Sequence, residues 1–429
     1  MRELRSPYLL LGLTTGVLLP FSTPILADRG FSAAGIGLLL AVTSVAILLA
    51  MPAWGHLGDI VLGRRPTLRL AAVLSALAAL GLSAPTALPL VGAAFIAWYV
   101  LQAAPPVLLD SIAMRELGSE RESYGRLRLL LSFSYAVAAF VVGILYDRVG
   151  YGAAYFVFCA ATLALVLSLG RARSRPPGSR AGIRPAGGPP APPPPGTAAN
   201  VARRRPGLRR PGLGSTGAAL RTAPRVIGAL SAILLASIGL LTASTFLPLR
   251  LHDLGATPSI IASSAVVSAL FEIPIMLAGR RMVASLGLRG FFVIGCLMYL
   301  VATASWIVVD DPVLLVASRA VTGLGYGSFT VASVVALGVM LPSGLQASGQ
   351  ALRQSAISAV AVMAFLFGGL VYNLLGSAAF FALATSGPAL GALLGWRFLP
   401  RRGASTALGT GSLSDANIVP VSIDGMPPS

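Results

Sequence analysis

Long apolar stretches, separated by short polar connections, run along most of the chain. We place them at about 7–27, 33–54, 67–84, 88–110, 124–146, 152–170, 224–249, 257–279, 289–309, 312–340, 346–374 and 377–399. A helix needs about 20 apolar residues to cross the hydrocarbon core of a bilayer, and these stretches reach or approach that length. The pattern therefore predicts an all-α, polytopic membrane protein with twelve transmembrane helices.

The stretches fall into two groups of six, separated by a polar segment. Residues 171–222 are rich in Pro, Gly and Arg, and residues 401–429 also lack apolar runs. Such composition cannot bury enough apolar surface to fold alone. We therefore expect two six-helix bundles, residues 1–170 and 223–400, joined by a disordered basic linker on the cytoplasmic side and followed by a disordered tail.

The two groups also resemble each other at one place. Leu19-Pro20 precedes Gly30 near the end of the first stretch, as Leu247-Pro248 precedes Gly255 near the end of the seventh. Parallel repeats of six spans are a known transporter architecture. The sequence thus favours an internal repeat.

Arginines gather in alternate connections between the stretches. If the N-terminus is inside, the outer connections hold only Arg29, Arg148 and Arg250, and the other loop arginines lie on the inner side. Cytoplasmic loops of membrane proteins carry an excess of positive charge. We therefore expect both termini to be cytoplasmic and the protein to lie in a bacterial inner (plasma) membrane.

Composition agrees with a membrane protein and argues against other classes. Hydrophobic residues make up 55% of the chain and charged residues 11%, whereas about 25% of a typical soluble chain is charged. The net charge of +18 follows from arginines in the inner loops, so we expect no nucleic-acid partner. Cys159 and Cys296 fall in separate stretches and form neither a disulfide framework nor a metal site. The chain has no lysine for a phosphate-binding loop, and we expect no enzyme activity, cofactor or metal.

The connection after the second stretch combines glycines with one acid and two arginines. It reads Gly55-His56-Leu57-Gly58-Asp59-Ile60-Val61-Leu62-Gly63-Arg64-Arg65. This resembles the signature loop of the major facilitator superfamily, Gly-x-Leu-Ala-Asp-Arg-x-Gly-Arg-Arg, although it is one residue longer and Ile60 replaces an arginine. The resemblance implies that the loop fastens helix ends and helps to set a gate; the alternative is a positive-inside turn with one capping aspartate. The residues concerned are Gly55, Asp59, Gly63, Arg64 and Arg65.

Asp110 lies near the end of one apolar stretch, and Arg126 and Arg128 lie near the start of the next. A charge in a bilayer costs roughly 2.5–3.5 kcal/mol on insertion scales and usually pairs or lines a polar cavity. Antiparallel neighbours bring Asp110 and Arg128 to similar depth, whereas Arg126 points ~160° away from Arg128, so we favour Arg128 as the partner.

The run from Pro105 to Asp110, followed by Tyr124-Gly125-x-x-Arg128, resembles the lactose permease and phenylpropionate permease branch of the superfamily. In that branch an acid and an arginine with this spacing pair. The resemblance implies a role for Asp110 and Arg128 in solute binding or proton exchange. The alternative is an ion pair that only holds two helices together.

Glu272 lies within the eighth stretch and has no charged neighbour in the sequence. It must face a central cavity, be protonated, or both. Phe271-Glu272-Ile273-Pro274 resembles the phenylpropionate permease group, and the alternative is a neutral glutamate bonded to another helix. Arg319 and Arg353 are further candidates for a solute or gating role. Other polar residues that we expect to line the cavity are Thr14, Thr15 and Gln102.

The resemblance ends in the tenth stretch. Lactose permease has a His and a Glu one turn apart there for proton coupling, whereas this chain has Thr322 and Gly325, so that mechanism does not carry over. We expect a monomeric secondary transporter that moves a small organic solute (a sugar, nucleoside or aromatic acid) together with protons by alternating access. Its partners would be the solute, protons and the lipid bilayer. The alternatives are a sugar or drug efflux transporter of the same superfamily and a membrane receptor that does not transport.

Overall fold

The computed structural model describes residues 2–84, 87–117, 123–171, 224–341 and 346–401, and the regular structure of these residues is helical throughout. The first half contains α1 (Arg2–Leu18), η1 (Leu19–Phe21), α2 (Ser22–Asp28), α3 (Ala33–His56), η2 (Leu57–Val61), α4 (Arg64–Gly81), α5 (Leu88–Leu117), α6 (Ser123–Val149), η3 (Tyr151–Ala153) and α7 (Ala154–Arg171). The second half contains α10 (Pro224–Asp253), α11 (Pro258–Val308), α12 (Pro312–Met340) and α13 (Gln346–Phe398). Residues 172–223 and 402–429, where we predict the linker and the tail, lie outside the described residues.

The helices agree with the twelve apolar stretches. Ten helices in the described part of the chain are long and apolar enough to cross a membrane. α4 is a further helix, excluded from that set because its first turns contain Arg64, Arg65 and Arg69. α13 is one of these ten, although Gly376 (φ 85°, ψ 171°) divides it into two helices. With α4 and both parts of α13, the helices match the twelve predicted stretches. The predicted fold class, all-α with twelve transmembrane helices in two bundles, is therefore confirmed.

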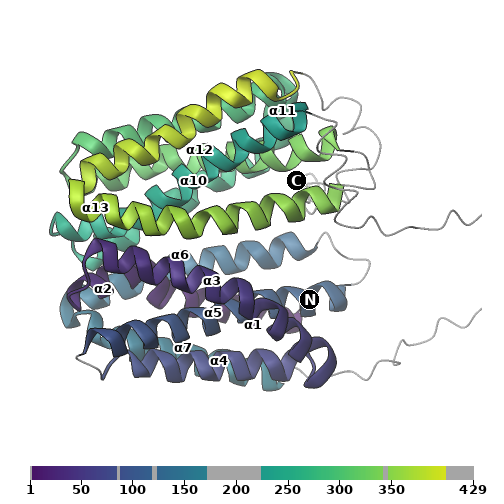
Figure 1. Cartoon of the computed structure of the whole chain (residues 1–429). Helices are drawn as coiled ribbons and strands as arrows, with labels where there is room; N and C mark the ends of the chain where they lie inside the picture. Colours follow the sequence, from purple (N-terminus) through teal and green to yellow (C-terminus); the bar gives the residue numbers. More distant parts are fainter. Residues whose placement is uncertain (1, 85–86, 118–122, 172–223, 342–345, 402–429) are drawn as a thin grey trace, which may run out of the picture.

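The two halves lie side by side, with α1–α7 below and α10–α13 above in Figure 1. Both ends of the described chain lie at one end of the molecule, on the right of the figure, which we call the terminal end. The turns after α2, α6 and α10 lie at the opposite, far end. The long axes of the helices connect these two ends.

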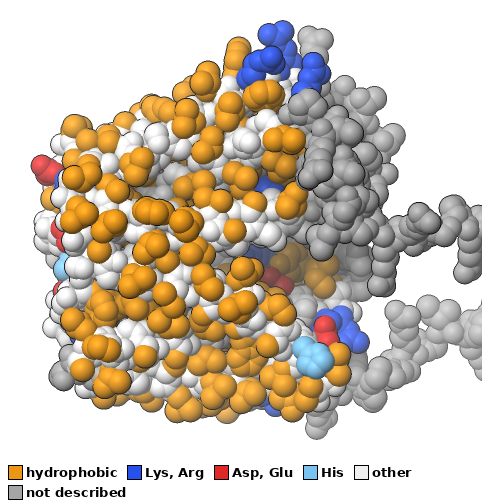
Figure 2. Space-filling model, in the orientation of Figure 1, with side chains coloured by type: hydrophobic (Ala, Val, Ile, Leu, Met, Phe, Trp, Pro, Cys, Tyr) orange, Lys and Arg blue, Asp and Glu red, His pale blue; other side chains and the backbone are white. Residues whose placement is uncertain are grey.

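Hydrophobic side chains cover most of the face of both halves that is shown in Figure 2. Some are large and strongly exposed, such as Leu49 (72%), Phe156 (63%) and Trp396 (57%). Apolar patches of this extent are rare on soluble monomers. This surface fits a protein whose sides contact lipid.

Turns of the same kind recur in both halves. Every positive φ in the described residues belongs to a glycine, because a Cβ is disfavoured there. These glycines form pairs at corresponding connections: Gly30 with Gly255, Gly63 with Gly287, and Gly150 with Gly376. In the first pair the backbone N–H donates at 2.9 Å to Ala27 O in one half and to His252 O in the other. The matching turns support the internal repeat that Leu19-Pro20 and Leu247-Pro248 suggested.

At the terminal end, each half has a matching contact between its third and its sixth helix. The guanidinium of Arg69 on α4 donates to Leu169 O at the end of α7, at 2.6 Å. Arg289, early in the second helix of α11, donates through Nε to Leu399 O just after α13, at 2.7 Å. In each half an arginine therefore joins the third helix to the sixth.

Small residues let the two halves pack closely toward the far end. α3 packs on α13 and α6 packs on α11. A Cβ on Gly37 would lie 2.8 Å from Gly369 Cα, and a Cβ on Gly143 would lie 3.0 Å from Ser259 Cα. Close backbone approach at small residues is the usual way in which membrane helices associate. These crossings hold the halves together on the far side of the molecule.

Polar contacts reinforce this closure at the far end. His252 Nε2 lies 2.7 Å from Asp28 Oδ1, which joins the end of α10 to the end of α2. The backbone N–H of Ser259, at the start of α11, donates to Asp147 Oδ1 of α6 at 2.9 Å. The far end of the molecule is therefore closed by contacts between the halves.

Candidate functional site

A cavity of about 700 Å³ lies between the two halves. Ligand sites for small organic molecules usually enclose about 300–1,000 Å³. Figure 2 shows the surface hollowed between the halves toward the terminal end, with basic and acidic side chains visible inside. The polar residues that line the cavity are Ser44, Tyr99, Ser237, Ser244, Thr245, Ser268, Glu272, Tyr299, Arg319, Tyr326, Thr330, Arg353, Gln354 and Ser358.

Three of the predicted residues line this cavity: Glu272 on α11, Arg319 on α12 and Arg353 on α13. Arg319 is buried, with 9% of its surface exposed, and the other two are half-buried. All three come from the second half, whereas the first half contributes uncharged residues such as Ser44 and Tyr99. Among the described residues, the charged side of the cavity is therefore built by the second half.

The three charged residues lie at different depths. Arg319 Nε contacts Ser264 O, in the first turns of α11, and Gly327 packs against the backbone of Glu272. Residues 319 and 327 are ~12 Å apart along α12 at 1.5 Å per residue. The amide of Gln350, one turn before Arg353, donates to Val334 O, still nearer the terminal end. Glu272 therefore lies between the depths of the two arginines.

Neutral groups hold Arg319 in place. Its Nε donates to Ser264 O at 3.3 Å and its Nη1 to Ser244 Oγ at 3.4 Å. Its guanidinium carbon lies 5.7 Å from the ring centre of Trp306, a favourable distance for a cation and an aromatic face. Ser244 Oγ also lies 3.2 Å from Tyr299 Oη. Within the described residues, the partners of this buried cation are thus uncharged.

Helical spacing explains how the sequence builds the lining. On α13, residues 353, 357, 361 and 365 recur every four positions, and Gln354 and Ser358 lie beside them. On α10, Ser237, Leu241 and Thr245 form a similar row. Residues four apart share one face of a helix. This spacing was the available signal for Gln354, which our sequence reasoning missed together with Tyr99, Tyr299 and Tyr326.

Our expectation for three other polar residues was wrong. Thr14 and Thr15 donate to Leu11 O in the preceding turn of α1, at 2.8 Å each. Gln102 accepts a hydrogen bond from Ser75 Oγ at 3.3 Å, between α5 and α4. None of the three lines the cavity. A hydroxyl in an apolar helix can satisfy itself on its own backbone, so polarity alone did not indicate a cavity position.

Asp110 and Arg128 meet, but not in this cavity. Arg128 Nη1 lies 3.4 Å from Asp110 Oδ2, and Tyr8 Oη donates to Asp110 Oδ1 at 2.7 Å. The aspartate thus joins α1, α5 and α6. Arg128 rather than Arg126 is the partner, as the helical geometry indicated; Arg126 is exposed. The side chains of Arg128 and Asp110 are 51% and 30% exposed, so the pair is not deeply buried.

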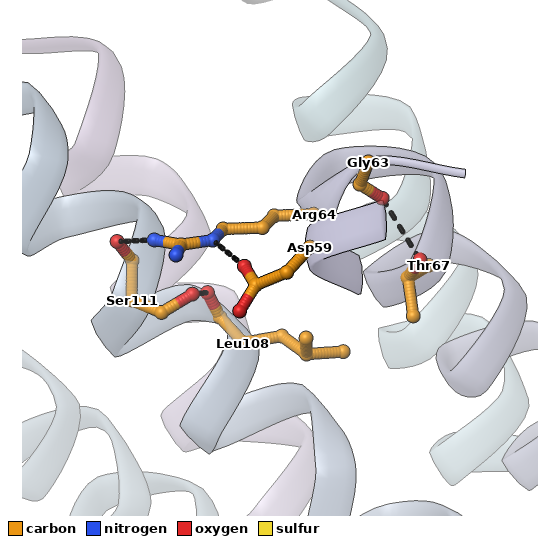
Figure 3. A network of polar contacts seen from close by, with 6 residues as sticks. All are labelled: Asp59, Gly63, Arg64, Thr67, Leu108 and Ser111. Atoms are coloured by element: carbon orange, nitrogen blue, oxygen red, sulfur yellow. Dashed lines mark hydrogen bonds and ion pairs between the residues drawn. The ribbon is translucent and has the colours of Figure 1, made fainter. Parts of the chain in front are cut away.

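The signature-like loop is anchored within the first half (Figure 3). Arg64 Nε contacts Asp59 Oδ1 at 2.7 Å, and Arg64 Nη1 donates to Ser111 O on α5 at 2.8 Å. Gly63, with φ 83° and ψ 156°, makes the turn before α4, and its carbonyl accepts from Thr67 Oγ1 at 2.8 Å. The loop therefore connects the terminal ends of α3, α4 and α5.

A second contact extends this anchor. Arg65 Nη2 lies 2.7 Å from Glu116 Oε1, near the end of α5. Gly55 is exposed at the end of α3, and a Cβ added there would meet no other atom within 4 Å. The five loop residues predicted to act together are thus neighbours, and their role in gating stays a prediction.

Comparison with known proteins agrees with this architecture. The model of the MFS_1 like family matches residues 1–383. Maltose permease from Geobacillus stearothermophilus is 25% identical over 351 residues, which cover 79% of this chain and 76% of the permease.

Solved transporter structures have the same fold. The nucleoside transporter NupG is 15% identical and superposes with a TM-score of 0.73 over 92% of this chain and 97% of its own. A D-xylose–proton symporter is 16% identical, with a TM-score of 0.65 over 93% of this chain and 97% of its own. From the match of the family model over most of its length, the chain belongs to the MFS_1 like family and is a transporter of the major facilitator type.

Proposed function

We propose that the protein is a secondary active transporter that moves a small organic solute across the membrane by alternating access, coupled to protons. The observation that supports this most is the cavity between the halves, with the ionisable Glu272 on its wall and the far end closed beside it. Rocking of two six-helix bundles about a central site is the usual mechanism of this architecture.

In this proposal the solute binds in the cavity, which in this conformation is reached from the terminal end. The closing contacts at the far end, between α2 and α10, α3 and α13, and α6 and α11, then separate as contacts form at the terminal end. Because the cavity is complete within one chain, a monomer is sufficient for transport. We expect the terminal end to face the cytoplasm of a bacterial cell.

The chemistry of the wall supports a solute that has both polar groups and an apolar face. Tyrosines and phenylalanines offer flat surfaces, and serine, threonine and glutamine side chains offer donors and acceptors. The relatives described above are named for maltose, nucleosides and xylose. We carry over only what these solutes share, which is a small, polar organic molecule.

Glu272 is our proposed proton carrier, since it is the one carboxylate among the described residues that line the cavity. A carboxyl group there can lose its proton to one side of the membrane and regain it from the other as the halves rock. Asp110 is the second candidate, because its pair with Arg128 is partly exposed and can open.

The test is uptake by the purified protein in proteoliposomes, with a panel of sugars, nucleosides and organic acids, each with and without an imposed pH gradient. We expect at least one solute to accumulate against its gradient only when the pH gradient is present. Binding without translocation of any panel member would favour a receptor, and accumulation that ignores the pH gradient would contradict proton coupling.

A further inference from the structure

The charges on the cavity wall do not balance. Arg319 and Arg353 line it, and Glu272 is the one acid among its described lining residues. When Glu272 is ionised the wall therefore has one positive charge in excess, and when Glu272 is protonated it has two. A positive charge that is removed from water without a negative partner is unfavourable.

Arg319 is the cation with the least compensation. It is 9% exposed, it lines the cavity, and its described partners are a main-chain carbonyl, a serine hydroxyl and the face of Trp306. A guanidinium has five N–H donors, and two of them are used here at 3.3 Å and 3.4 Å. Donors therefore remain for a ligand at the deep end of the cavity.

Arg353 has a similar deficit nearer the terminal end. Its Nε donates to Gln350 Oε1 at 3.2 Å, and it is half-buried. Neither arginine makes an ion pair within the described residues with Glu272, although all three line the same cavity. Within the described residues, the hydrogen-bond partners of both arginines are thus uncharged, and donors remain for an acceptor from a ligand.

From this we infer that the transported solute is an organic monoanion, whose carboxylate binds Arg319 and whose uncharged body lies among the tyrosines and hydroxyls of the cavity. The inference rests on the proposed transport function and specifies its substrate class. A single carboxylate cancels the excess charge of the wall, whereas a phosphate dianion would reverse it. Guanidinium groups bind carboxylates through short, charge-assisted pairs of hydrogen bonds.

The inference also specifies what the proton does. With the carboxylate bound and Glu272 ionised, the wall and solute together are neutral; a proton on Glu272 leaves them with one positive charge. A solute anion and a proton that cross together carry no net charge across the membrane. If one proton accompanies each solute anion, we therefore expect the transport rate to be independent of the membrane potential.

The experiment compares matched pairs of solutes that differ only in the acid group: a sugar acid with its sugar, an aromatic acid with its alcohol, and a uronic acid nucleoside with its nucleoside. Binding to the purified full-length protein is measured by titration calorimetry. We expect the acid of the preferred pair to bind about tenfold to a hundredfold more tightly than its neutral partner, as charge-assisted hydrogen bonds predict.

Two variants with opposite expected effects make the result specific. Arg319→Gln should remove the preference, so that the acid binds no better than its neutral partner. Glu272→Gln should increase the preference several-fold, because it removes the one negative charge of the wall; general misfolding cannot produce such a gain. Arg148→Gln removes a positive charge, as Arg319→Gln does, but from an exposed residue of α6 outside the cavity. It should leave the affinities for the acid and for its neutral partner unchanged.

Equal binding of both members of every pair, or an equal loss for both in Arg319→Gln, would overturn the inference and leave the transport function intact. Failure of every solute to bind, acid or neutral, would instead contradict the proposed transport function itself.

Discussion

Glu272 is the residue on which the proposed proton coupling depends. Glu272→Gln keeps the shape and hydrogen-bonding capacity of the protonated acid but cannot release a proton. We expect this variant to lose accumulation driven by a pH gradient while it retains exchange of solute between equilibrated compartments. Both rates can be measured with radiolabelled solute in proteoliposomes. Loss of exchange as well would make Glu272 a direct ligand of the solute, and full retention of accumulation would leave Asp110 as the candidate.

Asp110 and Arg128 offer a second test at the residue scale. The pair is partly exposed, and exposed pairs contribute about 0–1 kcal/mol to stability. Asp110→Ala, Arg128→Ala and the double variant should therefore unfold at temperatures close to that of the parent protein, while each lowers transport. Thermal unfolding and uptake are measured on the same samples.

Tyr8→Phe is a useful addition to that set, because it removes a hydrogen bond of Asp110 and no charge. A double variant that transports normally would show that the pair has no role in the cycle. Strong destabilisation of either single variant, relieved in the double variant, would show instead that the pair is mainly structural.

Residue-scale reasoning from the sequence was most informative where a charge lay in an apolar stretch. Glu272, Arg319 and Asp110 were identified because a charge in an apolar stretch needs an explanation. The sequence did not show that Glu272 and Arg319 line one cavity while Asp110 lies elsewhere, since that depends on how each helix is rotated. Tyr8 and Tyr299 were missed because a tyrosine is common in a membrane helix and nothing in the local sequence marks its partner.

At the scale of elements, the loop between α3 and α4 links three helices through few contacts. Asp59 is 55% exposed, so Asp59→Asn should cost little stability, but it releases Arg64 from one of the two partners that it has among the described residues. If the loop helps to hold the gate, turnover should fall several-fold with little change in solute affinity. Initial rates over a range of solute concentrations separate the two quantities.

Asp310→Asn is a matched control for that experiment. It also breaks a pair of an exposed aspartate with an arginine, Arg250, but at the far end of the second half. Normal turnover in Asp59→Asn would reduce the role of Asp59 to that of a local cap on the turn.

Helix positions were largely predictable, because about 20 consecutive apolar residues leave few alternatives to a spanning helix. The breaks within the predicted stretches were not: η1 interrupts the first stretch at Leu19–Phe21 around Pro20. The break of α11 at Gly287, by contrast, falls between the eighth and ninth predicted stretches. Proline and glycine indicate where a helix can be broken, but packing against neighbours decides whether it is.

At the scale of the whole molecule, sidedness is open to a direct test. The structure places both ends of the described chain at one end, and arginine placement predicts that this end is cytoplasmic. In a background with Cys159→Ser and Cys296→Ser, a single cysteine at Gly187 or Ser414, which lie outside the described residues, should resist an impermeant thiol reagent applied to right-side-out vesicles.

Gly152→Cys provides the positive control, because Gly152 is exposed in the turn before α7 at the far end, with open space around its Cα. It should be labelled rapidly from outside. Labelling at Gly187 or Ser414 with protection at Gly152 would reverse the orientation that we expect and the side from which the cavity is reached.

The position of Trp306 has a practical consequence. The chain has four tryptophans, and Trp306 is fixed by a 2.7 Å hydrogen bond from Nε1 to Ser318 Oγ, with its ring beside the guanidinium of Arg319. Indole emission responds to a nearby charge, so an anion that draws this guanidinium away or neutralises it should alter the fluorescence of the unlabelled protein. Comparison with Trp306→Phe would isolate that signal. The protein therefore contains its own optical reporter, by which occupancy can be followed in real time without a dye or a radioactive solute.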